Sequence, residues 1–321
     1  MNQIYLFKDV ENLVNQFENV LNRNGINITH GSELERICLN VTNILEQHLN
    51  PKLRDNKTDI RPYFREFVGL QDLISKIVKS ESNPNFSLLI QHLQTLNNKN
   101  PLQNISTSVL NQDNDKIFEL YLATLCLNLN PTDIKVDNPK SSKGDNPDII
   151  SVFNNKKWGF GCKSLHSSNY KSIYDNVEKA VSQIENSESE IGIPVISIKN
   201  IIDHNSFWPI INEKDYLNGE EPVFGSFIDL SYPLATLQKY VNDIYEELIS
   251  NIGESQLLQL FYNKKSVEGI FIFCSTTSAI ASVNYPLVTR LNIFHLVRFG
   301  NISSDVFSIL NNLNHQLQLI K

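Results

Sequence analysis

The sequence predicts an α/β protein with a mixed central β-sheet flanked by helices, preceded by an all-helical region. Residues 1 to about 108 repeat apolar side chains every three or four positions, as amphipathic helices do. From about residue 113, apolar helical segments alternate with short runs that read as strands, which is the pattern of an α/β layer arrangement. We therefore expect a helical region over 1–110 and an α/β domain over 111–321, joined through the turn-rich segment 97–107.

Composition limits the class of protein. The 321 residues, 41% hydrophobic and 20% charged, are typical of a globular protein. No run of 18 apolar residues occurs, and the N-terminus does not resemble a signal peptide, so we expect a cytoplasmic protein without membrane contact. The net charge of −7 argues against a surface that binds nucleic acid everywhere but allows a local cationic cleft. Phosphate-binding glycine motifs are absent, so no nucleotide cofactor is expected.

The helical region should contain four helices, over 9–23, 32–49, 62–78 and 85–96. Ser32 and Glu35 have the spacing of a capping box at the start of the second helix. The four cysteines are scattered without zinc-site spacing, and we expect buried thiols at Cys38, Cys126, Cys162 and Cys274.

The second region should begin with an apolar helix over 113–129 and a short strand over 132–137. The stretch "NPDIISVFNNKKWGFGCKS", residues 146–164, reads as two antiparallel strands joined by a turn at Asn154 and Asn155. The remaining expected elements are a helix over 170–186, a strand over 192–201, a helix over 233–251 and strands over 268–274 and 291–299.

The stretch 146–164 carries an acidic residue, Asp148, in its first predicted strand and a lysine, Lys163, at the end of its second. An ammonium group near a core is costly unless an anionic group requires it. Strand alternation puts Trp158, Phe160 and Cys162 on one face and Lys157, Gly159, Gly161 and Lys163 on the other. The question is whether the lysine performs chemistry or only ends a strand.

The helix with Glu119, the "PD" at Pro147 and Asp148, the strand ending in "GCK" at Lys163, and the helix and strand that follow resemble the PD-(D/E)xK nuclease superfamily. Type II restriction endonucleases are its best-known branch. The resemblance covers about residues 113–205. It implies a restriction-endonuclease-like fold and a Mg²⁺-dependent endodeoxyribonuclease that hydrolyses phosphodiester bonds of double-stranded DNA, with Mn²⁺ as a possible substitute. Two-fold symmetric cutting would favour a homodimer, with the helical region supplying DNA contacts or a dimer surface.

By this resemblance, Asp148 would be the central metal ligand, and Lys163 would orient or deprotonate the attacking water. Magnesium accepts only one or two carboxylates, so few acidic residues suffice. Glu119 would be a second ligand, or alternatively a helix-margin glutamate paired with Lys116 or with solvent. Glycines on the lysine face are expected to leave room for a metal and a phosphate.

One position departs from the family pattern. An acidic residue is expected two positions before the lysine, where this sequence has Gly161. Some restriction enzymes of this superfamily carry the missing carboxylate on the following helix, which here offers Glu178 and Glu185. Both lie at a margin of the apolar stripe, and Glu178, nearer the strand ends, is the preferred metal ligand and catalytic residue. An ordinary solvated glutamate is the alternative for each.

Polar residues around the hairpin could contact DNA phosphates or base edges. The candidates are Lys143, His166, Ser167, Asn169 and Lys171. A hydrophilic loop is the alternative, and the other lysines near the hairpin read more simply as solvated. Asp145 is expected to shape a turn, and Asp203 and His204 to make loop hydrogen bonds.

Two further functions stay open at this point. One is a repair or phage-defence nuclease of the same fold without strict sequence specificity. The other is a DNA-binding or assembly protein that lost activity together with the carboxylate at Gly161.

Overall fold

The computed structural model describes residues 7–49, 56–107, 112–140, 146–282 and 286–319. The first helices are α1 (Phe7–Arg23), α2 (Glu33–Leu49) and α3 (Arg61–Ser80), followed by the short helices η2 (Phe86–Leu89), α4 (Ile90–Leu93) and η3 (Gln94–Asn97). Then come α5 (Gln112–Asn128), β1 (Ile134–Val136), β2 (Ile149–Phe153), β3 (Lys156–Ser164), α6 (Tyr170–Glu185) and β4 (Ile191–Ser197). The chain continues through η4 (His204–Phe207), α7 (Glu213–Leu217), α8 (Ser231–Ile252), α9 (Glu254–Phe261), β5 (Gly269–Ile280), β6 (Leu287–Arg298) and α10 (Ser304–Gln318).

In the described part of the chain, six strands form one mixed sheet in the order β1-β2-β3-β4-β5-β6. The first three strands are antiparallel neighbours. Strand β4, which follows the crossover helix α6, is parallel to β3, and β5 is parallel to β4. Strand β6 returns antiparallel to β5. The expected α/β architecture with a mixed sheet and an N-terminal helical region is therefore confirmed.

The β2–β3 hairpin turns where the sequence predicts. Asn154 and Asn155 have φ values of 50° and 59°, in the left-handed region that asparagine tolerates better than most residues. This two-residue turn sets the register, which pairs Ile149 with Phe160. The register in turn places Asp148 beside the last residues of β3.

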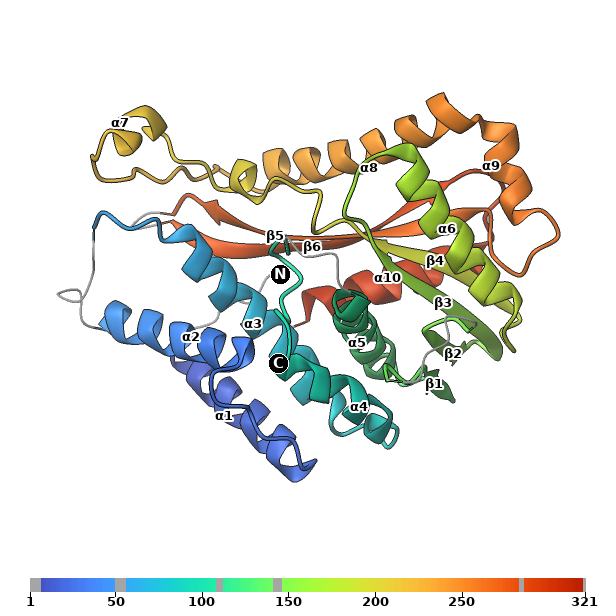
Figure 1. Ribbon diagram of the computed structural model, residues 1–321, viewed down its shortest axis with the longest axis horizontal. Coiled ribbons are helices and arrows are strands. Elements are labelled where there is room, and N and C mark those ends of the chain that lie inside the picture. The colour runs from blue at the N-terminus through green and yellow to red at the C-terminus, as the bar shows by residue number, and fades with distance from the viewer. Residues whose placement is uncertain (1–6, 50–55, 108–111, 141–145, 283–285, 320–321) are drawn as a thin grey trace.

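Helices cover both faces of the sheet, and each face has its own apolar core. In Figure 1, α6, α8 and α9 lie on one side of the sheet, and α3, α5 and α10 on the other. Side chains of β5 alternate between the two cores: Phe271 and Phe273 pack with α5 and α10, whereas Ile270 and Ile272 pack with α6 and α8. This alternation follows the two-residue period of a strand.

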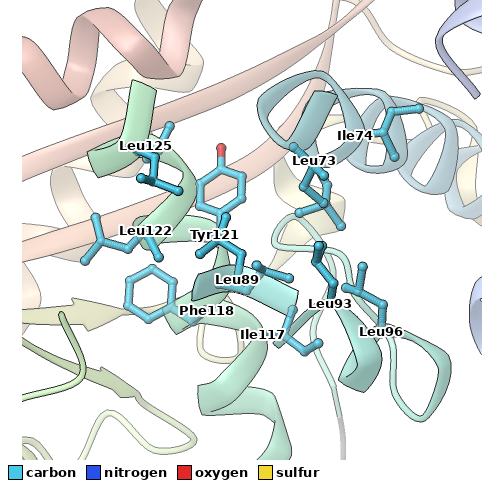
Figure 2. Close-up of a cluster of buried hydrophobic side chains, with 14 of the residues drawn as sticks. Leu73, Ile74, Leu89, Leu93, Leu96, Ile117, Phe118, Tyr121, Leu122 and Leu125 are labelled. Atoms are coloured by element: carbon cyan, nitrogen blue, oxygen red, sulfur yellow. The ribbon is translucent and has the colours of Figure 1, made fainter. Parts of the chain in front are cut away.

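The helical region shares the larger core with the sheet. Among the described residues, that core runs from Val10 of α1 to Leu317 of α10, and the N-terminal helices form no separate cluster. Figure 2 shows part of this core, to which α3 contributes Leu73 and Ile74, α4 contributes Leu93, and α5 contributes Phe118 and Tyr121. The boundary expected at residue 110 lies within 108–111, outside the described residues, and the two regions share this core.

A buried polar network also joins α3, α5 and β6. The Asp72 carboxylate accepts hydrogen bonds from Lys76 Nζ (2.8 Å), Tyr121 Oη (2.6 Å) and Asn292 Nδ2 (2.8 Å), and it pairs with Arg290. Several donors to one carboxylate compensate its loss of hydration.

Three features differ from the expectation. The segment 85–96, expected as one α-helix, is helical but consists of the short α-helix α4 between the 3-10 helices η2 and η3. Strands β5 and β6 are each longer than predicted, and α7, α9 and α10 were not anticipated. The extension of β5 includes the polar run Ser275–Ser278, which is buried. Ser275, Thr276 and Thr277 satisfy their hydroxyl groups through Asn292 Oδ1 (2.8 Å), His204 Nδ1 (2.9 Å) and Asn104 Nδ2 (2.8 Å). Ser278 Oγ has no hydrogen-bond partner among the described residues.

The capping of α2 is confirmed in part, and the burial of the cysteines is confirmed. Ser32 Oγ caps α2 by accepting the Glu35 backbone N–H (3.1 Å), but the Glu35 carboxylate accepts from Gly31 N instead of closing the box on Ser32. All four cysteines are buried free thiols, as predicted. Within the described residues, no helix combines the length and apolar character needed to cross a bilayer.

Candidate active site

Asp148 lies immediately before β2, and the backbone fixes its side chain. The Cys162 N–H of β3 donates to Asp148 Oδ2 at 2.6 Å, which prolongs the hydrogen-bonded ladder between the two strands. The Asp148 carbonyl accepts from Asp137 N at 2.9 Å on the other side. With 2% of the residue exposed, the carboxyl group is held at one position.

Lys163 brings a positive charge to the same place. Its Nζ lies 3.8 Å from Asp148 Oδ2 and donates to the Cys162 carbonyl at 2.9 Å. The side chain is 14% exposed, so most of it is withdrawn from water. The lysine at the end of this strand therefore has the anionic partner that its position requires.

Glu119 reaches Asp148 from α5. It is 1% exposed, and its carboxyl group is within hydrogen-bonding reach of the Asp148 carboxyl. Lys116 Nζ donates to both Glu119 oxygens, at 2.7 and 2.9 Å, and lies 3.8 Å from Asp148 Oδ1. His92 Nε2 of α4 lies 3.2 Å from Glu119 Oε2. The residues Lys116, Glu119, Asp148 and Lys163, with His92 behind them, are called the carboxylate cluster below.

The electrostatics of the cluster follow from burial. Loss of hydration, with the neighbouring Glu119 carboxyl as the next cause, raises the pKa of Asp148 to about 7. Burial also raises the pKa of Glu119, although Lys116 acts in the opposite direction. Burial lowers the pKa of Lys116, but the Glu119 and Asp148 carboxylates outweigh it and the net shift is upward. Burial lowers the pKa of His92 to about 4, so this imidazole is neutral at pH 7.

The donor set can be compared with what a divalent cation needs. Within the described residues, no three His, Cys, Asp or Glu side chains are arranged to hold a metal ion together. The cluster offers two carboxyl groups, Glu119 and Asp148. Magnesium keeps most of its water ligands and takes one or two protein carboxylates, so this pair fits magnesium but not an all-protein cage.

Gly161 does not open space beside the lysine, which corrects the expectation for this face. A Cβ at Gly161 would lie 2.9 Å from Ala180 Cβ and 3.1 Å from Ala180 Cα and O, against the backbone of α6. A Cβ at Gly159 would lie 2.9 Å from Ser189 Oγ. The two glycines allow α6 and the chain after it to pack tightly on β3, so they do not line a cavity for a phosphate.

The structure does not bring Glu178 to the carboxylate cluster. Its side chain is exposed on α6, whereas the neighbouring Val177 is buried in the second core. Its charge acts on Tyr174 instead, adding to the effect of burial in raising the pKa of that phenol. Glu185 has a structural role at the far end of the helix, where its Oε2 accepts the Lys265 backbone N–H at 2.8 Å. Of the three glutamates considered, only Glu119 joins Asp148.

The proposed DNA-contact residues follow β3 directly. His166, Ser167 and Asn169 lie in the loop between β3 and α6, and Lys171 is in the first turn of α6. Ser167, Asn169 and Lys171 are exposed, and His166 is partly exposed. Asn169 also caps α6 by accepting the Lys171 N–H at 2.9 Å. Lys143 and Asp145 lie outside the described residues.

Other lysines near the hairpin have local partners. Lys135 and Lys157 pair with Glu188, and Lys156 pairs with Asp305. The Asp203 side chain caps η4, and His204 hydrogen-bonds with Thr276 and the Lys199 carbonyl. These contacts agree with the simpler interpretations of solvated lysines and loop hydrogen bonds.

His92 has no predicted role in the sequence, and Lys116 is predicted only as an alternative partner of Glu119. The spacing of Lys116 and Glu119, three positions apart on one helix, contains the signal for that pair. Nothing in the sequence connects His92 with Glu119, because tertiary packing brings α4 against α5. The His92 Nδ1 atom has no hydrogen-bond partner in the part of the chain that the structure describes.

Comparison with known proteins adds no relative to this geometry: the chain matches no family model, no curated protein and no solved structure.

Proposed function

We propose that the protein is a Mg²⁺-dependent endodeoxyribonuclease that hydrolyses phosphodiester bonds of duplex DNA, similar to type II restriction endonucleases. The observation that carries the proposal is the meeting of Glu119, Asp148 and Lys163, from three different elements, at the end of β3. The order α5-β1-β2-β3-α6-β4 also agrees with the resemblance noted in the sequence. Two buried carboxyls beside a lysine are an expensive arrangement that a purely structural site would not need.

Each residue has a task in this proposal. Asp148 and Glu119 would hold Mg²⁺, which when bound would neutralise phosphate charge and make a water molecule nucleophilic. Asp148 is oriented by the Cys162 N–H, and Glu119 by His92. Lys163 would orient the attacking water and stabilise negative charge that develops on the phosphate. The exposed residues Ser167, Asn169 and Lys171 beside the strand end would contact the DNA backbone or bases.

The test uses supercoiled plasmid DNA and the purified protein, with Mg²⁺, Mn²⁺, Ca²⁺ or excess chelator. Mg²⁺ and Mn²⁺ should support conversion to nicked and linear forms on an agarose gel. Ca²⁺ should not, because its longer and looser coordination would misplace the attacking water. Cleavage in excess chelator would refute the metal mechanism. Two-fold cutting of both strands would further predict a homodimer by analytical ultracentrifugation.

A second candidate function is a DNA-binding protein without nuclease activity. The observation that favours it is Gly161, which stands where the resemblance expects a metal ligand and which packs against Ala180. Tight DNA binding in a mobility-shift assay, with no cleavage in any metal, would select this candidate. A repair or phage-defence nuclease would instead cut plasmids without a fixed recognition sequence.

A further inference from the structure

Lys116 is placed between the two carboxyl groups. Its Nζ is 2.7 and 2.9 Å from the two Glu119 oxygens and 3.8 Å from Asp148 Oδ1. Lys163 approaches Asp148 from its other oxygen, Oδ2, at 3.8 Å. The carboxyl pair therefore lies between two ammonium groups, of which Lys116 makes the closer contacts.

These contacts occupy the oxygens that a divalent cation would need. Magnesium binds carboxylate oxygens at about 2.0–2.1 Å in near-octahedral geometry. An ammonium group hydrogen-bonded to both Glu119 oxygens fills the space on their bonding side, and its positive charge would repel a second cation placed there. Lys116 and a metal ion cannot both hold Glu119 in this way.

We propose that the Lys116 ammonium group is a built-in occupant of the cation position, and that it has to withdraw before Glu119 and Asp148 can bind a divalent cation. Lys116 would thereby set the metal concentration at which the site loads. This inference rests on the proposed metal-dependent function, because it concerns the same two carboxyl groups.

The surroundings of Lys116, Glu119 and Lys163 indicate which of these side chains can move. Lys116 has a flexible four-carbon stem, so its ammonium group can swing out toward solvent, and its side chain, 15% exposed, is about as accessible as that of Lys163. Glu119 cannot follow, because its side chain is almost fully buried and His92 Nε2 lies 3.2 Å from its Oε2. Lys163 makes longer contacts to the carboxyl pair and is tied to the Cys162 carbonyl, so it can stay while Lys116 leaves.

The inference is tested by metal binding to the full chain without DNA. Isothermal titration calorimetry with Mn²⁺ would compare the wild type with Lys116→Met, which keeps the stem but removes the charge. We expect the Kd for Mn²⁺ to fall at least tenfold in Lys116→Met. Lys116→Arg, which keeps the positive charge, should not bind Mn²⁺ more tightly than the wild type. Lys239→Met, at an exposed position on α8, is the matched control and should leave the Kd unchanged.

The wild type supplies a second measurement, in which a variant serves only to assign one resonance. With ¹³C-labelled lysine, the Lys116 Cε resonance should shift when Mg²⁺ is added, because the ammonium group leaves the carboxylates, while Lys239 should not respond. The peak that is missing from the Lys116→Met spectrum is assigned to Lys116. If Lys116→Met does not fold, Lys116→Gln is used for the assignment instead.

The outcomes separate this inference from the proposed function. If the wild type binds Mn²⁺ and Lys116→Met binds it equally or more weakly, the role of Lys116 is refuted while the metal site stands. A Lys116 resonance that stays unchanged at saturating Mg²⁺ also refutes it. If neither the wild type nor Lys116→Met binds Mn²⁺, both the inference and the metal-dependent function are refuted.

Discussion

At the scale of single residues, Asp148 and Lys163 combine low exposure with positions set by backbone groups. Asp148 accepts the Cys162 N–H, and Lys163 donates to the Cys162 carbonyl, so one residue of β3 orients both side chains. Neither side chain fills an apolar core. Their replacement should therefore affect chemistry much more than folding.

We expect Asp148→Asn and Lys163→Met each to lower the plasmid-cleavage rate by roughly a thousandfold or more, because a bound metal and a charged group beside it contribute several kcal/mol to transition-state stabilisation. DNA affinity should be largely kept, since phosphate contacts elsewhere supply it. Cleavage assays and mobility shifts measure the two effects, and circular dichroism confirms folding. Near wild-type cleavage by either variant would show that the site is wrongly assigned.

The choice of the second carboxylate is also a residue-scale question. Because Glu119 is buried beside Asp148 and Glu178 is exposed, Glu119→Gln should abolish cleavage while Glu178→Gln should cut at close to the wild-type rate. Cleavage kinetics under saturating Mg²⁺ compare the two. An active Glu119→Gln together with an inactive Glu178→Gln would show that Glu178 is the second carboxylate, as the sequence predicts.

At the scale of elements, the packing of α6 on β3 explains why an acid is absent at Gly161. A side chain there would point at the Ala180 backbone, 3.1 Å from its Cα and O atoms. The helix could tolerate a carboxylate on that strand only by moving away from the sheet. The close approach of α6 to β3 therefore excludes an acidic side chain at position 161.

Gly161→Ala should lower the free energy of unfolding by about 1–3 kcal/mol through overpacking. Chemical denaturation of Gly161→Ala, Ala180→Gly and the double variant forms a double-mutant cycle. The double variant should be more stable than the sum of the single effects, because Ala180→Gly removes the Cβ that lies 2.9 Å away. A Gly161→Ala protein as stable as the wild type would contradict this account. Gly161→Glu should be more destabilised still, so this substitution is not expected to restore a ligand on the strand.

At the scale of the whole molecule, two buried histidines make stability depend on pH. Burial lowers the pKa of His204 to about 4, and that of His92 to about 4 as well, against 6.5 in an unfolded chain. Between pH 6.5 and 4 the unfolded state binds protons that the native state does not. The stability that these two histidines contribute therefore falls as pH decreases through this window, and their contribution levels off below pH 4, where both imidazoles are protonated in both states.

His204→Gln should reduce this acid dependence, because glutamine can hydrogen-bond with Thr276 and the Lys199 carbonyl without titrating. The free energy of unfolding should decline with acid less steeply than in the wild type, by up to about 1.4 kcal/mol per pH unit. Urea denaturation at pH 7.5, 6, 5 and 4.5 measures the slope, with His315→Gln at an exposed position as the control. An unchanged slope in His204→Gln would show that His204 is not the residue responsible.

The sequence by itself determined the order of elements from α5 to β4 and the pairing of Asp148 with Lys163. Both depend on local information: apolar periodicity defines each element, and a two-residue turn at Asn154 and Asn155 fixes the register of one hairpin. Once the register is fixed, each residue of one strand has a defined neighbour on the other strand. This part of the candidate site could therefore be read from a stretch of about twenty residues.

Only the tertiary structure decided which glutamate joins Asp148 and what surrounds it. Helix periodicity places Glu178 and Glu119 at helix margins but does not say how deeply each margin is buried, because this depends on the distance and tilt at which each helix packs. Three of these features depend on segments that are far apart in the chain. They are the contact between His92 and Glu119, the packing of Ala180 on Gly161, and the burial of Ser275–Ser278. Such contacts are set by the packing of whole elements, and no local pattern in the sequence encodes them.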